Sequence, residues 1–403
     1  MPTPLISTGT LLRDQLAGRV AIVSGAGRGI GFEAARALAW LGAQVVIAEM
    51  DRKTGLSAAA RINTEFGRDC AVFIPTDIGS ERSVADLARQ IDRRLGRVDI
   101  ILNNACLVRI GAVDQTKTGD WDASYRVNLL GPVMLAQQFI PGMRARRSGV
   151  FVCVTSKGVA YMGPYEVMKA AQLHLADTLA AELEGSGVLV FAIGPGLVRT
   201  PGAEQFIPQI APLYGKSVDE FYEMNRAHIL PVEAAGAGFA AAIALADRFC
   251  GQEIGSIQAL IAAGIDVKGI QADVIEKDWT EEAYSEALDL ARRLTTTLAE
   301  QAEGWQKRPL FERQWVIRDF RKHAGMPVEE WLHLLERLSA GLEARDPAAV
   351  AGVHAPIDVL AGYFKHLQDQ YAGYEKDPQK LKETLPILEG WEQDARKLMK
   401  LFS

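Results

Sequence analysis

Short apolar segments alternate with longer amphipathic segments along the first two thirds of the chain. The first apolar run, VAIVSG from Val20, is followed by a helix-like stretch and then by a second run, QVVIAEM. Four later runs, AVFIPTD, VDIILNNA, GVFVCVTS and GVLVFAIGPG, continue the same rhythm. Strands that are apolar throughout and separated by helix-length segments are typical of a parallel sheet covered by helices on both faces. The pattern predicts an α/β fold with a doubly wound parallel sheet of six strands, and a seventh strand around residues 254–262.

The pattern changes after Gly264, where helix-like segments follow one another without a strand-like run. Five of the seven tryptophans lie in this region, which favours a packed body over an unstructured tail. One segment repeats its apolar side chains at helical spacing. These are Val328, Trp331, Leu332, Leu335, Leu338 and Leu342. We predict two parts: residues 1–264 form the α/β domain and residues 265–403 form an all-helical C-terminal extension.

Composition and charge exclude several classes of partner. The chain is 48% hydrophobic and 23% charged, as expected of a folded protein, and its net charge of −6 argues against nucleic-acid binding. No apolar run approaches the ~18 residues of a membrane span, and the start lacks the pattern of a signal peptide. We therefore expect no membrane partner and a cytoplasmic location, with the four scattered cysteines reduced.

A glycine-rich turn joins the first predicted strand to a helix-forming stretch. Its residues are Ser24, Gly25, Gly27, Arg28, Gly29, Ile30 and Gly31. A helix that begins there presents unpaired N–H groups and the positive end of its dipole, and glycine lets a phosphate approach the backbone. The spacing is not GxGxxG but fits TGxxxGxG, with Ser24 in place of threonine. Because a strand precedes it and a helix follows, we predict a dinucleotide site rather than a plain turn.

Glu49 ends the second predicted strand, where a carboxylate can accept hydrogen bonds from an adenosine ribose. A carboxylate repels a 2′-phosphate, so Glu49 favours NAD. Arg28 favours NADP, because a guanidinium in the glycine loop can pair with that phosphate. We predict NAD, with NADP as the less favoured cofactor, and a solvated strand end as the alternative role of Glu49.

Tyr165 and Lys169 are four residues apart in a helix-like segment, so their side chains share a face. A tyrosine with its ordinary pKa near ~10 is a poor base at neutral pH, but a nearby ammonium favours the phenolate. We therefore predict that Lys169 lowers the pKa of Tyr165, which then exchanges a proton with a substrate hydroxyl during hydride transfer. Ser156 closes the preceding strand and can hold the substrate oxygen. Asn104 and Asn128 are, taken singly, better explained as backbone caps.

Together these motifs resemble the short-chain dehydrogenase/reductase family over roughly residues 15–264. The resemblance implies a Rossmann-type NAD(P)-binding domain that forms a homodimer or homotetramer. It also implies a catalytic tetrad of Asn128, Ser156, Tyr165 and Lys169. In these terms Tyr165 is the general acid/base, Ser156 orients the carbonyl, Lys169 binds the nicotinamide ribose and Asn128 organises a proton-relay water.

The resemblance implies further cofactor contacts outside the glycine loop. Asp77 resembles the adenine contact, Asn104 resembles the asparagine of the NNAG motif beside the adenosine, and Thr200 of PGLVRT resembles the threonine that meets the carboxamide. The implied set is Asp77, Ile78, Asn104, Ala105, Tyr165, Lys169, Pro195, Gly196, Val198 and Thr200.

The chain departs from the family pattern at three places. Cys106 replaces the glycine of NNAG, which adds bulk beside the cofactor channel. Only nine positions separate Ser156 from Tyr165, so the loop between them is shortened, and Thr155 is an alternative hydroxyl. QALIAAG replaces the Asp-Gly-Gly that ends the last strand in the family, a place tied to subunit packing.

Residues 201–231 fall where the family carries its substrate-covering segment, and Tyr214, Phe221 and Tyr222 either line an apolar pocket or pack as ordinary helix residues. The histidines, including His174, show no metal-ligand spacing, so we predict no metal.

The leading hypothesis is an NAD(P)-dependent oxidoreductase that acts on an alcohol or ketone. Two alternatives stay open: a cofactor-binding scaffold or regulatory protein whose helical tail binds a partner, and a lyase or epimerase with tightly held NAD. The tail itself either stabilises the protein, covers the substrate pocket or docks another protein.

Overall fold

The computed structural model describes residues 4–156, 160–225, 229–267, 281–345 and 353–401. It divides the chain into two compact units, Met1–Ala272 and Asp273–Ser403, which are described separately below.

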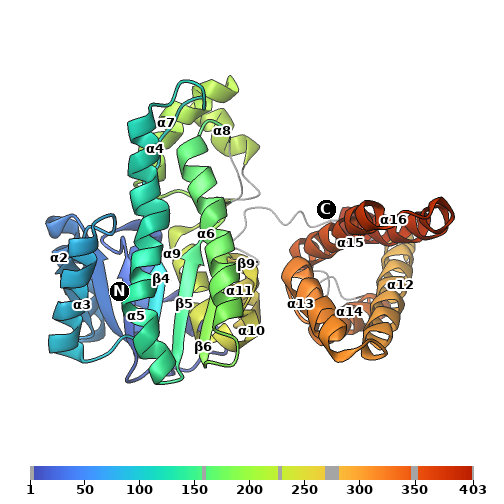
Figure 1. The fold of residues 1–403 in the computed structure, drawn as a ribbon, viewed down its shortest axis with the longest axis horizontal. Coiled ribbons are helices and arrows are strands. Elements are labelled where there is room, and N and C mark those ends of the chain that lie inside the picture. The colour runs from blue at the N-terminus through green and yellow to red at the C-terminus, as the bar shows by residue number, and fades with distance from the viewer. Residues whose placement is uncertain (1–3, 157–159, 226–228, 268–280, 346–352, 402–403) are drawn as a thin grey trace. The chain divides into compact units, whose positions relative to one another are not determined.

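A seven-stranded parallel sheet forms the centre of the first unit, in the order β3-β2-β1-β4-β5-β6-β9 (Figure 1). Its strands are β1 (Val20–Ser24), β2 (Gln44–Glu49), β3 (Ala71–Pro75), β4 (Ile100–Asn103), β5 (Gly149–Val154), β6 (Val188–Gly194) and β9 (Glu253–Gly255). The predicted doubly wound α/β sheet is confirmed. The order reverses between β1 and β4, and ligands of such sheets bind at the carboxyl ends of the strands at this point.

The seventh strand was predicted too long. Glu253–Gly255 pairs with β6, but Ser256–Ala262 forms helix α11. The residues of QALIA are good helix formers, and a short apolar run does not distinguish a strand from a buried helix. Helix α11 packs on α9 (Val232–Ala244), where a Cβ on Gly238 would lie 2.7 Å from Ser256 Cβ.

Helices cover both faces of the sheet, and a hydrophobic core lies on each side. One face carries α1 (Gly29–Trp40), α2 (Arg52–Phe66), α9, α10 (Ala246–Phe249) and α11. The other face carries α3 (Glu81–Leu95), α5 (Gly131–Ala145) and α6 (Gly163–Glu182). Successive strand residues alternate between the two cores, as the pleat requires. Ala21 belongs to the first core, for example, and Ile22 to the second.

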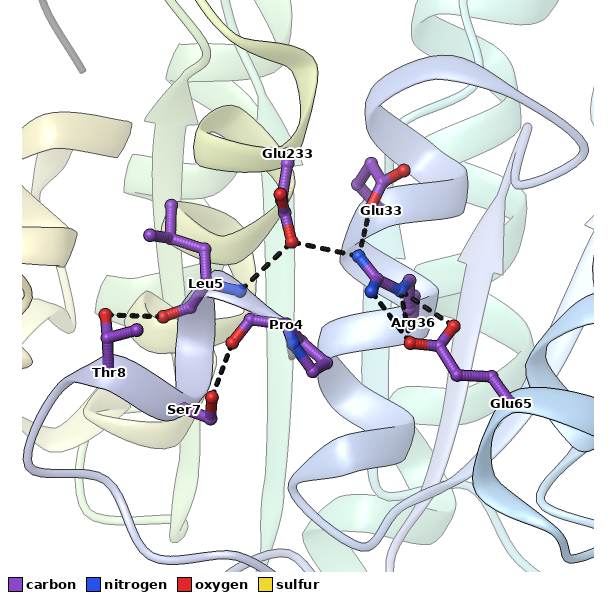
Figure 2. A network of polar contacts seen from close by, with 8 residues as sticks. All are labelled: Pro4, Leu5, Ser7, Thr8, Glu33, Arg36, Glu65 and Glu233. Atoms are coloured by element: carbon purple, nitrogen blue, oxygen red, sulfur yellow. Dashed lines mark hydrogen bonds and ion pairs between the residues drawn. The ribbon is translucent and has the colours of Figure 1, made fainter. Parts of the chain in front are cut away.

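Arg36 is the centre of a buried ionic network on α1 (Figure 2). Its guanidinium contacts Glu33 at 3.2 Å, Glu65 at 2.7 Å and Glu233 of α9 at 2.9 Å. The side chain of Arg36 is 10% exposed. Burial raises the pKa of Glu33, while the Glu65 carboxylate raises the pKa of Arg36. The network therefore joins α1, α2 and α9 through one cation.

The N-terminal segment lies beside the end of α11. Helix η1 (Leu5–Thr8) is held by the Leu5 N–H, which donates to Glu233 Oε1 at 3.0 Å (Figure 2). The Thr10 N–H donates to the Ala263 carbonyl at 2.8 Å, and the Thr10 hydroxyl donates to the same oxygen at 3.0 Å. The segment before β1 and the end of α11 thus lie side by side.

The second unit is helical. It contains α12 (Glu281–Gln306), α13 (Leu310–Ala324), α14 (Val328–Glu343), α15 (His354–Tyr374) and α16 (Pro378–Leu401). Its own core confirms the predicted face of α14, because Val328, Trp331, Leu335, Leu338 and Leu342 are buried and Leu332 packs against them. Within the described ranges of both units, we find no helix that is long and apolar enough to cross a membrane.

Candidate active site

The glycine loop is pinned to the end of β4 by two polar side chains. The Ser24 hydroxyl accepts the N–H groups of Asn104 and Ala105, each at 3.0 Å. The Asn104 amide donates back to the carbonyls of Ser24 at 2.9 Å and Gly25 at 3.2 Å. A Cβ on Gly31 would lie 2.4 Å from the Gly25 carbonyl oxygen and 2.5 Å from the Asn104 amide, so this packing requires glycine.

Helix α1 begins directly after this loop and has a free N-terminus. Arg28 stands at the N-cap position and makes no side-chain capping bond, so the first N–H groups of α1 are available to an anion. Thr200 lies close to the start of α1, because a Cβ on Gly29 would lie 3.5 Å from Thr200 Cβ. Thr200 follows β7 (Leu197–Val198), where Val198 is buried and Gly196 has a φ of 81°. This cradle fits a dinucleotide pyrophosphate.

Glu49 lies against the glycine loop. Its carboxylate accepts the Gly27 N–H at 3.1 Å through Oε2 and the Asp51 N–H at 3.1 Å through Oε1. Arg28 is exposed, and hydrogen bonds from Thr54, assisted by the Arg28 charge, lower the pKa of Asp51. The carboxylates of Glu49 and Asp51 and the guanidinium of Arg28 are therefore charged groups at this end of the loop.

Asp77 and Ile78 follow β3. Asp77 is exposed and accepts the Gly79 N–H at 2.9 Å, whereas Ile78 is buried in the second core. Of the two, only Asp77 presents a polar side chain to solvent.

Tyr165 and Lys169 stand on α6, beside the carboxyl end of β5. The buried Lys169 ammonium donates to the Val154 carbonyl at 2.6 Å and lies 5.7 Å from the centroid of the Tyr165 ring. Burial lowers the pKa of Lys169 and raises the pKa of Tyr165 well above its ordinary value. The predicted lowering of the Tyr165 pKa is therefore wrong for this structure, because burial raises this pKa more than the hydrogen bond with Ser156 lowers it.

Ser156 lies beside Tyr165 despite the shortened loop. Its hydroxyl donates to Glu166 Oε1 at 2.9 Å, and a hydrogen bond between Ser156 and Tyr165 opposes the rise in the Tyr165 pKa. Thr155 is buried elsewhere, with its hydroxyl donating to Glu253 Oε1 of β9 at 2.8 Å. Of the two hydroxyls left open by the sequence, the structure therefore brings Ser156 to Tyr165. The glutamate beside Tyr165 was not singled out from the sequence.

Asn128 is fully buried in η2 (Arg126–Leu130), one turn of π-helix. Its side chain pairs with both backbone groups of Leu107, each at 2.8 Å, and also donates to the Ser124 hydroxyl at 2.8 Å. The Gln172 amide donates to the Asn128 carbonyl. Gln172 is fully buried, and its Oε1 has no hydrogen-bond partner among the described residues. Sequence reasoning missed Gln172, although it stands three residues after Lys169.

Ala105 and Cys106 connect the two halves of the site. A Cβ on Gly25 would lie 2.9 Å from Ala105 Cα, so Ala105 touches the glycine loop. The neighbouring Cys106 is exposed and lies close enough that its charge adds to the rise in the Tyr165 pKa and opposes the fall in the Lys169 pKa. The glycine loop and the Tyr165 hydroxyl therefore belong to one site.

An apolar cluster from the covering segment packs over Tyr165. The segment forms α7 (Ala203–Ile210), η3 (Ala211–Tyr214) and α8 (Val218–Met224), and Figure 1 shows α7 and α8 beyond the carboxyl ends of the strands. Phe221 and Tyr222 are buried, whereas Tyr214 is 37% exposed and contacts Phe221 edge-on at 5.8 Å. These aromatic residues pack on one another, and Tyr165 borders their cluster.

Residues 19–210 match the family model described as short chain dehydrogenase. Oxidoreductase UcpA of Escherichia coli (strain K12) is 34% identical over 209 residues, which cover 51% of this chain and 78% of that protein. Trans-4-hydroxycyclohexanecarboxylate dehydrogenase of Sinomonas cyclohexanicum is 31% identical, over 47% of this chain and 75% of that protein. A short chain dehydrogenase of Pseudocercospora fijiensis is 34% identical, and the match covers 62% of its length and 47% of this chain.

Solved structures share the fold. The crystal structure of L-sorbose reductase from Gluconobacter frateurii, complexed with NADPH and L-sorbose, has a TM-score of 0.56 at 23% identity. The matched region covers 60% of this chain and 97% of the reductase chain. A single-residue variant of actinorhodin polyketide ketoreductase, solved with NADPH, has a TM-score of 0.55 at 25% identity over 60% of this chain and 97% of that chain.

Proposed function

This chain belongs to the short-chain dehydrogenase/reductase family, and from that premise we propose that it transfers a hydride between NAD(P) and an alcohol or ketone. The observation that carries the proposal is the meeting of Ser156, Tyr165 and Lys169 at the carboxyl end of β5, joined to the glycine loop through Ala105. The relatives named dehydrogenases and reductases support the same reaction class.

Each side chain has a proposed role in that reaction. The bound nicotinamide supplies or accepts the hydride. Ser156 holds the substrate oxygen, and Lys169 binds the nicotinamide ribose. Asn128 organises a water molecule that relays protons. Tyr165 donates its hydroxyl proton to the oxygen during reduction and takes it back during oxidation. Residues 1–264 carry this activity, and residues 265–403 form the helical extension.

The raised pKa of Tyr165 predicts the direction of efficient catalysis. The hydroxyl is protonated at neutral pH, which is the form needed to reduce a carbonyl. We expect kcat/KM for reduction to be constant around neutral pH and to fall at alkaline pH. We expect kcat/KM for alcohol oxidation to rise about tenfold per pH unit at pH values below the Tyr165 pKa. Parallel pH profiles in the two directions check this, and a rise of the reduction rate with pH contradicts it.

The acidic surroundings of the glycine loop favour NAD. We expect Glu49→Gln to weaken NADH binding about tenfold or more, because a hydrogen bond to a carboxylate contributes roughly 1.5–3 kcal/mol. The same change should strengthen NADPH binding, since a repulsive charge is removed. Calorimetric titration with each cofactor measures both effects, and the exposed Glu182→Gln on α6 is the control. A wild-type preference for NADPH would instead give Arg28 the deciding role.

The direct test of the proposed function is isotopic. Reduced cofactor carrying deuterium at the transferable position is incubated with the full chain and a panel of ketones, and products are analysed by mass spectrometry. Deuterium on the carbinol carbon supports hydride transfer. Conversion without net oxidation of the cofactor would point to a lyase or epimerase, and bound cofactor without conversion of any ketone would point to a scaffold.

The family also implies an assembly. We propose that the chain forms a homodimer or homotetramer, which sedimentation of the full chain would measure.

A further inference from the structure

We propose that the C-terminal helical unit binds one divalent transition-metal ion through Asp319, His323 and His366. Asp319 and His323 are one turn apart on α13, and His366 faces them from α15. No metal was expected from the sequence, because His366 is distant from His323 along the chain and stands on α15, whereas His323 stands on α13. Folding brings the three side chains together, and their donor atoms lie within 4.8 Å of one another.

The spacing of the donor atoms suits a single ion. Asp319 Oδ1 lies 3.3 Å from His323 Nδ1, and Asp319 Oδ2 lies 3.6 Å from His366 Nε2. In a tetrahedral zinc site with bonds of about 2.1 Å, neighbouring donors are about 3.4 Å apart. The two imidazole rings are stacked, with centroids 3.7 Å apart and planes inclined by 24°. Because each imidazole lone pair lies in the plane of its ring, the stacked rings must turn apart before both nitrogens face one ion, and His323 Nδ1 must leave the Asp319 carbonyl oxygen, which lies 3.0 Å away.

The contacts of His366 Nε2 leave room for a further ligand, because its polar neighbour, Asp319 Oδ2, lies 3.6 Å away. His366 Nε2 is buried and has no hydrogen-bond partner among the described residues. An ion beside Asp319 would satisfy this nitrogen and offset the carboxylate charge at the same time.

The donor set selects the kind of ion. Two imidazoles and one carboxylate suit zinc, cobalt or nickel, whereas magnesium and calcium prefer oxygen donors alone. The side chains of Asp319, His323 and His366 are 14%, 29% and 29% exposed, so an ion can enter from solvent. Three protein donors leave a coordination position open. The ion would fasten α13 to α15 beside Phe320, whose ring packs on Tyr363 at 4.8 Å.

The test titrates the full chain, freed of metal by a chelator, with cobalt(II) and separately with zinc(II). Asp319→Asn and His366→Gln remove donors, and His333→Gln removes an exposed histidine of α14 as the matched control. We expect wild type and His333→Gln to bind one equivalent more than the two donor variants. The cobalt spectrum should show ligand-field bands without the near-ultraviolet thiolate bands of a cysteine site. Equal binding by all four proteins, or thiolate bands for that equivalent, would overturn the proposal.

A second measurement needs no variant and therefore stands even where a substitution disturbs folding. Hydrogen exchange of the wild-type chain is followed with and without zinc. We expect zinc to slow exchange in peptides from α13 and α15, because the bound ion holds these helices together. Unchanged exchange in both helices at saturating zinc would refute the site. This outcome is independent of the proposed oxidoreductase activity, because neither measurement uses a nicotinamide or a substrate.

Discussion

Replacing Tyr165 by Phe is expected to lower kcat for carbonyl reduction by about 10²–10⁴-fold, the usual contribution of a positioned proton donor. The substitution removes the hydroxyl that lies beside Ser156 and keeps the ring that lies 5.7 Å from the Lys169 ammonium. Binding of reduced cofactor should change little, because the glycine loop and Lys169 stay in place. Turnover is measured on any ketone identified by the isotopic screen, and cofactor affinity is measured by calorimetry.

Tyr125→Phe is the control for this prediction. Tyr125 is 44% exposed at the end of α4 (Thr118–Tyr125), and removing its hydroxyl should leave both kcat and KM unchanged. A Tyr165→Phe variant that reduces ketones within about threefold of the wild-type rate would remove Tyr165 as the proton donor. A large loss of cofactor binding in that variant would mean that its effect is structural.

Replacing Arg36 by Met is expected to lower the free energy of unfolding of the α/β unit by about 3–5 kcal/mol. The methionine fills similar space but removes the guanidinium that pairs with Glu33, Glu65 and Glu233. For a unit of this size such a loss corresponds to a fall in Tm of about 10 °C. Calorimetry of the full chain measures the shift of the transition that belongs to the α/β unit.

The pH dependence of this loss follows from Glu33. Burial already raises the folded-state pKa of Glu33, so its ionised form opposes folding at neutral pH, and stability recovers as the pH falls and the carboxyl is protonated. The defect of Arg36→Met should therefore shrink at acidic pH. Arg89→Met breaks an exposed pair with Asp86 on α3 and should stay within about 0.5 kcal/mol of wild type. Equal effects of the two substitutions would show that the buried network adds nothing.

Much of the fold could be predicted because its signals are local. The apolar runs of the sheet, the glycine turn after β1 and the helical repeat of α14 each lie within a dozen residues or so, and each was found in the structure. The error at α11 has the same origin, because Ser256–Ala262 is a short apolar run whose partner, Gly238 of α9, lies elsewhere in the chain. A local pattern does not show which surface a segment will meet.

The parts of the candidate site that sequence reasoning missed depend on distant contacts. Gln172 of α6 donates a hydrogen bond to the Asn128 carbonyl of η2, and the Thr155 hydroxyl after β5 donates one to Glu253 of β9. The pKa of Tyr165 was predicted in the wrong direction for a similar reason: the spacing of Tyr165 and Lys169 is visible in the sequence, but the burial of both is not. The spacing of Asp319 and His323 on one helical face was readable, but their meeting with His366 was not.

The contact between Thr10 and Ala263 has a topological consequence. Since the chain enters and leaves the α/β unit at neighbouring points, a short peptide joining these points would close the unit into a ring without stretching any strand. Circularly permuted versions, cut at an exposed turn such as Gly67 after α2, should therefore retain the sheet order.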